Sequence, residues 1–272
     1  MISDKDELTA YIEDALCGFL PNSDPASLIL EKAESYSLEA GGKRLRPLIL
    51  LAVCEMLGGR KEDALPFAVA LEFIHTYSLI HDDLPAMDND DMRRGRPSNH
   101  KAFGEDIAIL AGDALLTRAA VIMSEAVQKS ADIPGASKAM NAIMTAAYDM
   151  VRGQVSDIKA GEDPSFEYLE YVHKNKTSAL FRAAFAAGAY IADADEETCE
   201  DMINMGTQFG MAFQLLDDIL DYETDDCLNL AQILGIDKAK ELLASHMRSL
   251  KETLSKYENK EIIEKIISIG DI

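Results

Sequence analysis

Two clusters of aspartate residues in the sequence have spacings that could bind a metal ion. In QLLDDILDYE, Asp217 and Asp221 are four residues apart, so a helix would stack them on one face about 6 Å apart. Like charges at this spacing destabilise a helix unless a cation lies between them. A solvent-exposed acidic face is the alternative, but leucine and isoleucine residues closely flank these aspartates and Asp218. The pattern predicts carboxylates at the edge of an apolar surface.

The other cluster, HDDLPAMDNDD, comes earlier in the chain. Asp82 and Asp83 end an apolar run, and Asp88 follows six residues after Asp82. A regular helix would place Asp82 and Asp88 on different faces. Pro85 lacks a backbone donor and disfavours the helical conformation at Leu84, so a local distortion could return the two side chains to a common side.

Oxygen ligands alone suit a hard cation. Mg²⁺ typically takes one or two carboxylates and completes its coordination with water and substrate phosphate. A calcium-binding loop of the EF-hand type is the competing interpretation. Starting at Asp88, it would place Met92 and Arg93 where a ligand and a glycine belong, and Asn99 where a bidentate glutamate belongs. Magnesium is therefore the expected ion.

Two basic clusters stand out in an otherwise acidic chain. They are GGKRLRP, with Lys43, Arg44 and Arg46, and DMRRGRP, with Arg93, Arg94 and Arg96. The two glycines are typical of a break in the chain before a new helix. The free N–H groups at the start of that helix could bind an anion together with Lys43 and Arg46. Arginines can also grip a diphosphate with two parallel hydrogen bonds. Ion pairing with neighbouring acids is the alternative for each cluster; together with the aspartates they imply two diphosphate sites.

Helices must position these groups. Apolar residues recur at helical spacing almost throughout, and no run of alternating β-branched residues appears, so we expect an all-α fold. Glycine and proline breakers divide the chain into about eight to ten helices, which predicts a bundle around a deep central cavity. The longest are expected from about Glu62 to Asp83, Phe103 to Lys129, Ser137 to Lys159, Ser165 to Ala192 and Glu196 to Tyr222.

Composition narrows the function further. The 272 residues fit a single domain over 1–272, and 26 basic against 48 acidic residues give a net charge of −22. This charge disfavours nucleic acid and anionic membranes as partners. No apolar stretch approaches the roughly 20 residues of a membrane span, the best being Leu48 to Leu57, and the N-terminus lacks a secretory signal. We expect a cytoplasmic protein without stable membrane insertion, whose four cysteines form no CxxC pair.

The sequence resembles the polyprenyl synthetase family, specifically bacterial farnesyl diphosphate synthases and the related geranylgeranyl enzymes. The resemblance runs over nearly the whole chain. It rests on GGKRLRP, EFIHTYSLIHDDLPAMDNDDMRRGRPSNHK, LAGDALL, GQVSDI, KNKTSALF and FQLLDDILD, in this order.

The resemblance implies a site for isopentenyl diphosphate and an allylic diphosphate, with roughly three Mg²⁺ ions when substrate is bound. Metal ligands would be Asp82, Asp88 and Asp217, with Asp221, Asp83 and Asp218 in supporting or water-mediated roles. Arg93 would contact the allylic diphosphate, whereas Lys43, Arg46, His75 and Arg94 would bind the other diphosphate. Near the reacting centre would lie Lys176, Thr177 and Gln214. The resemblance also implies a homodimer.

Product length should depend on what closes the cavity. Tyr77 lies five residues before Asp82, beside Ser78, nearly one and a half helical turns deeper. In the resembling family an aromatic residue there goes with short products. We therefore expect a fifteen-carbon product, farnesyl diphosphate, with a geranylgeranyl product as the alternative.

The chain departs from the family after its second aspartate motif. About fifteen residues that carry lysines in the family are absent near Asp226 to Asn229. Either the chain has a deletion or a flexible segment is missing from the sequence. A terpene cyclase would not need the second diphosphate site, and a catalytically silent subunit would not need both aspartate motifs.

Overall fold

The computed structural model describes the chain apart from residues 1–4, 22–23, 162–163, 224–228 and 269–272. The supposed deletion near Asp226 to Asn229 falls largely on residues outside this description. The fold is all-α, as expected. Its elements are α1 (Lys5–Leu16), η1 (Cys17–Phe19), α2 (Leu28–Leu38), α3 (Leu45–Met56), α4 (Lys61–Asp82), β1 (Met92–Arg93), β2 (Arg96–Pro97), α5 (Asn99–Phe103), α6 (Glu105–Lys129), α7 (Ile133–Ile158), α8 (Phe166–Val172), η2 (His173–Thr177), α9 (Ser178–Ile191), α10 (Glu196–Leu220), α11 (Leu230–Leu234), α12 (Ile236–Leu254) and α13 (Glu261–Ile267).

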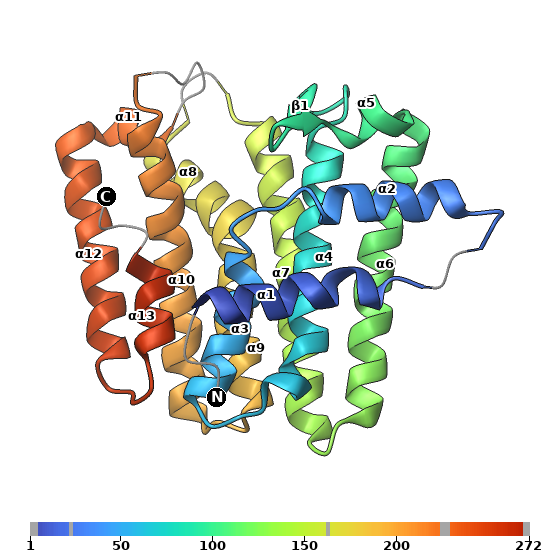
Figure 1. Ribbon diagram of the computed structural model, residues 1–272. Helices are drawn as coiled ribbons and strands as arrows, with labels where there is room; N and C mark the ends of the chain where they lie inside the picture. The colour runs from blue at the N-terminus through green and yellow to red at the C-terminus, as the bar shows by residue number, and fades with distance from the viewer. Residues whose placement is uncertain (1–4, 22–23, 162–163, 224–228, 269–272) are drawn as a thin grey trace.

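The long helices run side by side, and α1 and α2 cross them on one side (Figure 1). Helices α3 and α9 form the centre: ten of the twelve residues of α3 are buried, and eleven of the fourteen of α9. Apart from Arg46, Glu55 and Arg182, both sequences consist of apolar, aromatic or small residues, which is typical of a helix enclosed by others. The helices around them are amphipathic and turn one face inward.

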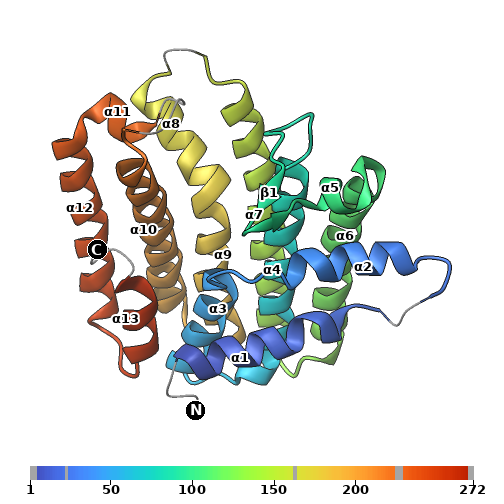
Figure 2. The same cartoon turned by 45° about the horizontal axis from the view of Figure 1, so that its top comes forward.

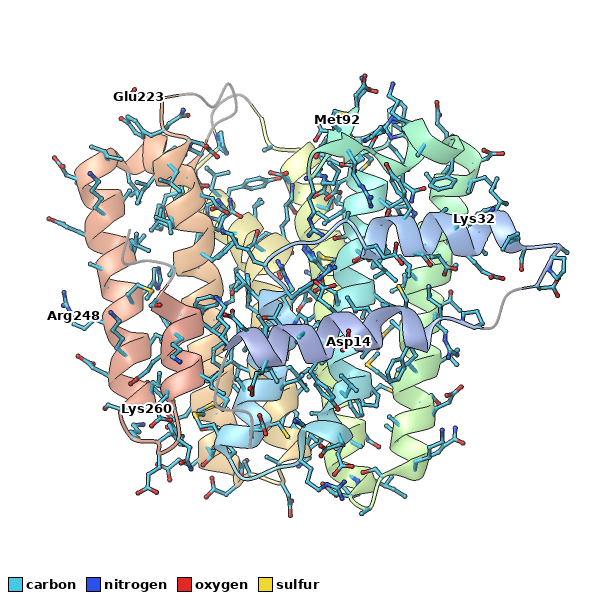
Figure 3. The ribbon with its side chains drawn as sticks, viewed as in Figure 1. Asp14, Lys32, Met92, Glu223, Arg248 and Lys260 are labelled. Carbon is cyan, nitrogen blue, oxygen red and sulfur yellow. The ribbon has the colours of Figure 1, made fainter. Side chains whose placement is uncertain are left out.

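The C-terminal ends of α4 and α10, which carry the two aspartate motifs, lie at the same end of the bundle (Figures 1 and 2). Met92 and Glu223, just after the two motifs, mark this end in Figure 3. A smaller apolar cluster, separate from the main core, lies here in the described part of the chain. It joins α8, α10, α11 and α12 and consists of Leu169, Leu215, Leu230, Ala231 and Ala239.

One expected helix limit was wrong, the start of α7. Gly104, with φ of 96°, separates α5 from α6, so the helix expected from about Phe103 begins at Glu105. Pro134 does not delay α7 to Ser137, because proline fits the first turn of a helix and Asp132 caps the Gly135 amide. The helical run over 165–192 contains a π-helical turn, η2, which changes its direction and register.

A two-stranded hairpin interrupts the otherwise helical fold after the first aspartate motif. Met92 pairs with Pro97, and Arg93 pairs with Arg96. The two residues of the turn, Arg94 and Gly95, both have positive φ, 53° and 78°. This is the conformation of a two-residue hairpin turn that matches the twist of its strands. Sequence alternation missed it because each strand has only two residues.

Helix α6 corrects our expectation for membrane spans. Among the described residues it is long and apolar enough, by length and composition, to cross a membrane. Only 39% of its most apolar stretch is buried. The inner face packs against the core, whereas Leu110 and Val121 remain 54% and 40% exposed. Part of the apolar surface of α6 is therefore exposed among the described residues.

Glu34 in α2 gives a testable dependence of stability on pH. It is 3% exposed, and burial, reinforced by Glu31 and opposed by Arg118, raises its pKa from 4.5 to about 7. The folded chain therefore keeps a proton that the unfolded chain releases, so stability falls as pH rises from about 4.5 through about 7. Glu34→Gln should raise the free energy of unfolding at pH 8 by roughly 2 kcal/mol.

Thermal melts at pH 5 and pH 8 measure this effect. The gain from Glu34→Gln should shrink at pH 5, where wild-type Glu34 is largely protonated. Glu39→Gln, at the exposed end of α2, serves as the control and should change neither melt. An equal gain at both pH values would show that the proton on Glu34 is not the cause.

Candidate active site

The loop after α4 has the distortion expected from Pro85. The Asp88 amide donates to the carbonyl of Asp82 at 2.9 Å, and the Met87 amide donates to Leu84 at 2.9 Å. The chain therefore folds back on the end of α4 instead of continuing the helix. Asp88 thereby comes close enough to Asp82 for its charge to raise the Asp82 pKa. The two carboxylates of the first motif thus face a common space.

Asp82 carries a carboxylate whose negative charge is only partly balanced by nearby positive charge. Burial raises its pKa to about 6, although the nearby Lys176 charge acts in the opposite direction. Burial also raises the pKa of Asp88, and Lys176 again opposes this. The charge of Lys176 acts on both partly desolvated carboxylates, yet their pKa values remain raised, so a bound cation would be favoured at this pair. The pair therefore could hold a cation.

The second motif repeats this arrangement on α10. Burial raises the pKa of Asp217 to about 6, while the charge of Lys43 lowers it. Asp221 is exposed at the end of α10, and its amide donates to the Asp217 carbonyl at 2.9 Å. Asp217 and Asp221 thus occupy successive turns, as their spacing predicts.

Asp218 points elsewhere. It is 5% exposed, accepts hydrogen bonds from the Leu230 amide at 2.9 Å and from Gln214 Nε2 at 3.1 Å, and lies 3.4 Å from His173 Nε2. The Asn229 side chain donates to its carbonyl. These contacts join α10 to η2 and α11. The Asp218 carboxylate is therefore held by protein groups and is placed to support the second aspartate motif.

The π-helix η2 connects the two motifs. Lys176 Nζ lies 2.5 Å from Asp157 and acts on the first motif, whereas the next residue, Thr177, donates to Gln214 Oε1 at 2.7 Å. Gln214 lies one turn before Asp218 on α10 and donates to it. The extra residue in a π-helical turn lets consecutive side chains reach both motifs.

Arg46 and His75 form a separate basic site. Arg46 Nη1 lies 3.4 Å from His75 Nε2, and its guanidinium stacks 4.3 Å above the Phe181 ring. Burial, with Arg94 nearby, lowers the Arg46 pKa to about 10, so Arg46 stays charged near pH 7. Burial and the neighbouring arginines hold the His75 pKa well below its ordinary value, so His75 is neutral there. Arg46 Nε is buried without a partner among the described residues, and an anion would satisfy it.

Arg44, between Lys43 and Arg46, has a structural role. Its side chain is fully buried and pairs with Glu72 at 2.8 Å and with Glu13 at 2.7 Å. It also donates to the Leu38 carbonyl. The ion-pairing alternative therefore holds for this residue. These contacts fix the start of α3 against α1, α2 and α4. They thereby fix the backbone that carries Lys43 and Arg46, which flank Arg44 in the sequence.

The hairpin sends its three arginines to different places. Arg93 pairs with the buried Asp83 and with Asp90. Arg94, at the turn, donates to the Gly41 carbonyl beside the basic site. Arg96 donates to the Tyr36 carbonyl and stacks on its ring at 4.6 Å. Asp83 thus forms an ion pair with Arg93. Among the three arginines of the hairpin, Arg94 is the one that lies beside the basic site.

A cavity of about 580 Å³ is lined by Asp82 of the first aspartate motif and by residues of η2 and of the basic site, whereas no described residue of the second motif lines it. Helices α3, α4, α6 and α7 and the η2 turn form its wall. The predicted site residues that line it are Arg46, His75, Tyr77, Ser78, Asp82, Lys176 and Thr177. The remaining wall is mainly apolar, with residues such as Met150 and Val155. The Ser78 hydroxyl donates to the His75 carbonyl, so it is used within α4.

The donor chemistry of the two aspartate motifs fits Mg²⁺. Asp82, Asp88 and Asp217 offer oxygen ligands only, and all three have raised pKa values that a bound cation would lower. No group of three or more such ligands converges in the part of the chain that the structure describes. Mg²⁺ commonly accepts one or two carboxylates at a time and takes water and phosphate oxygens for the rest.

Two features of the site were missed by sequence reasoning. Gly153 in α7 contacts η2 so closely that a Cβ would lie 2.2 Å from the Lys176 amide nitrogen. His173 lies behind the second motif beside Asp218. An isolated glycine inside the helical pattern of GQVSDI was a signal for the first. No sequence signal pointed to the second.

This architecture defines an isoprenoid synthase fold: an all-helical bundle with two aspartate motifs at one end, and with the first of these motifs and a basic site on the wall of one mainly apolar cavity. Comparisons with known proteins identify the family. The polyprenyl synthetase family matches residues 27–268. The chain belongs to this family.

The chain is also similar in sequence to individual prenyl diphosphate synthases. The farnesyl diphosphate synthase of Bacillus subtilis (strain 168) is 42% identical over 242 residues, covering 83% of this chain and 82% of that protein. A chloroplastic large subunit of a heterodimeric geranylgeranyl pyrophosphate synthase from Arabidopsis thaliana is 37% identical, covering 92% and 73%. A farnesyl diphosphate synthase from Geobacillus stearothermophilus is 41% identical, covering 89% and 87%.

Solved structures share the fold. An FPP/GFPP synthase from Zymomonas mobilis superimposes with a TM-score of 0.90 at 32% identity, covering 97% of this chain and 95% of that one. A geranyltranstransferase from Thermotoga maritima gives a TM-score of 0.83 at 34% identity, covering 98% and 96%.

Proposed function

We propose that this protein is a short-chain prenyl diphosphate synthase that extends dimethylallyl or geranyl diphosphate with isopentenyl diphosphate to farnesyl diphosphate. One observation carries the proposal: Asp82 and Lys176 on one side, and Arg46 and His75 on the other, line the same apolar cavity. A reaction that joins two diphosphates through their hydrocarbon parts needs this arrangement.

The first aspartate motif and η2 serve the allylic substrate. When bound by Asp82, Asp88 and Asp217, Mg²⁺ supplies charge that stabilises the departing diphosphate. Lys176 adds a positive charge close to this motif, and Thr177 is held in place by Gln214. Together these groups favour ionisation of the allylic C–O bond to a carbocation and diphosphate.

Arg46 and His75 serve isopentenyl diphosphate, with Lys43 and Arg94 nearby. Arg46 provides charge, whereas neutral His75 provides a hydrogen bond. The isopentenyl double bond attacks the allylic carbocation and forms the new C–C bond. The proton lost from the resulting cation passes to the released diphosphate. The apolar wall excludes water, which would otherwise capture the cation.

A product assay tests the proposal. Purified protein is incubated with Mg²⁺, isopentenyl diphosphate and either dimethylallyl or geranyl diphosphate, and chain lengths are determined by mass spectrometry with an EDTA control. We expect a metal-dependent fifteen-carbon product. A twenty-carbon product would favour the geranylgeranyl alternative. A cyclic hydrocarbon formed without isopentenyl diphosphate would identify a terpene cyclase, and no turnover of any allylic substrate would favour a silent subunit.

Tyr77 should limit the length of the product. It is 6% exposed and lines the cavity one and a half turns from Asp82. Tyr77→Ala should shift the main product from fifteen to twenty or more carbons, because the removed ring opens space at the floor. Tyr190→Ala, a partly buried tyrosine outside the cavity, is the matched control. An unchanged distribution in Tyr77→Ala would refute this role.

A homodimer accounts for the exposed apolar face of α6. Leu110 and Val121 on α6 and Tyr148 on α7 are each at least 40% exposed. A second copy of the chain, meeting this face around a twofold axis, would bury them. Light scattering coupled to size exclusion measures the mass in solution. A cytoplasmic location remains a prediction.

A further inference from the structure

The cavity contains a second ring beside Tyr77. His81 lies one helical turn further along α4. The two ring centroids are 5.7 Å apart and their planes meet at 77°, an edge-to-face contact. Such contacts favour one relative orientation of two rings. Both residues line the cavity, so the position of one ring affects the space left by the other.

Helix α6 holds His81 from the other side. His81 Nε2 lies 3.0 Å from the carbonyl oxygen of Ile109. A carbonyl oxygen can only accept, so Nε2 carries the proton and donates it. Ile109 itself lines the cavity. The imidazole therefore bridges Tyr77 on α4 and the backbone of α6.

This bridge depends on a glycine. A Cβ on Gly112 would lie 2.1 Å from His81 Nε2, 2.5 Å from Cδ2 and 2.8 Å from Cε1. The imidazole thus lies directly against the α6 backbone. Glycine destabilises a helix interior relative to alanine, and Gly112 is well inside α6, with helix on both sides. Room for the His81 ring gives this glycine a physical reason.

We propose that His81 and Gly112 are positioning residues for product length: together they fix the Tyr77 ring across the floor of the cavity. This inference rests on the proposed function, because the floor matters only if a hydrocarbon chain grows toward it. Neither residue needs to touch a diphosphate. Without the imidazole, or with it displaced, the Tyr77 ring can turn aside and admit a longer chain.

Three variants test this: Gly112→Ala, His81→Ala and the two combined. Each single variant should raise the ratio of twenty-carbon to fifteen-carbon product about tenfold, measured at equal conversion. In the double variant the new Cβ enters space that His81 has vacated. The ratio should therefore not exceed that of His81→Ala, which is strong non-additivity between contacting residues.

Two control variants separate this effect from a general loss of packing. Gly18→Ala adds a Cβ with no heavy atom within 4 Å, and His246→Ala removes a hydrogen-bonded histidine between α12 and α10. Both should keep the wild-type product ratio. If Gly112→Ala fails to fold, His81→Ala still carries the test, because it adds no volume.

The outcomes also separate the inference from the proposed function. If wild-type protein forms no prenyl product, the proposed function fails. If wild-type protein makes the fifteen-carbon product and His81→Ala keeps the same ratio, the function stands and the positioning role is overturned. Equal and independent effects of the two single substitutions in the double variant would also overturn it.

Discussion

Asp82→Asn should lower kcat about 1000-fold without lowering the melting temperature. The substitution keeps the shape of the side chain but removes the negative charge of a cavity-lining carboxylate that we propose as a ligand of Mg²⁺. Loss of one electrostatic group that acts in the transition state commonly costs 10²–10³-fold in kcat. Burial already disfavours the Asp82 anion and raises its pKa to about 6. A neutral amide there should therefore leave stability unchanged or slightly increase it.

Asp90→Asn provides the matched control. Asp90 belongs to the same aspartate-rich loop but is exposed, and it pairs with Arg93 at 3.3 Å. Its replacement should change kcat by no more than about threefold, since exposed ion pairs contribute little. Single-turnover rates and thermal melts are measured for both variants. If Asp82→Asn retained kcat within tenfold, Asp82 could not be a ligand of the essential ion.

Gly153→Ala should impair both folding and catalysis. A Cβ on Gly153 would lie 2.2 Å from the amide nitrogen of Lys176, 2.7 Å from its Cα and 2.8 Å from the carbonyl carbon of Asn175. These are backbone atoms, so the η2 turn must move as a unit. Displacing catalytic groups by about 1 Å can cost 10²-fold in rate, and overpacking a core costs typically 1–3 kcal/mol. We expect losses of this size in kcat and in the free energy of unfolding.

The measurement must separate these two effects. Activity is recorded well below the melting temperature and expressed per folded molecule, with Gly18→Ala as the control for added volume at an open position. A variant with a lower melting temperature but wild-type kcat would show that α7 and η2 can separate without disturbing Lys176. In that case the close packing would matter for stability alone.

The helices were predictable because their apolar periodicity is a local property of the sequence. Helices α4 and α10 begin and end within two residues of the expected limits. The details that the sequence pattern did not show depend on single backbone conformations. Gly104 adopts a positive φ, and η2 inserts a π-helical turn where the apolar pattern continues without interruption. Tertiary packing decides such positions, and a pattern of residue types does not record it.

The relative positions of Asp82 and Asp88 could be predicted from the sequence, whereas the positions of the basic groups could be predicted less well. Spacing and Pro85 together anticipated the return of Asp88 toward Asp82. The six basic residues of the two clusters looked alike in sequence, yet Arg44 is a buried structural cation and Arg46 lines the cavity. Which arginine pairs with an acid depends on contacts across more than twenty residues of chain, as between Arg44 and Glu72. The resemblance to a family, rather than spacing, selected Arg46.

The small apolar cluster around Leu230 lies beside the second aspartate motif and distinguishes it from the first. It buries far fewer residues than the main core, so the segment that carries it can open locally at a lower free-energy cost than the whole bundle. Asp218 depends on this segment, because it accepts the Leu230 amide. Both motifs lie at the ends of helices, α4 and α10, that are anchored in the main core. The second motif differs in that the hydrogen bonds of Asp218 also depend on a segment whose local opening costs less free energy.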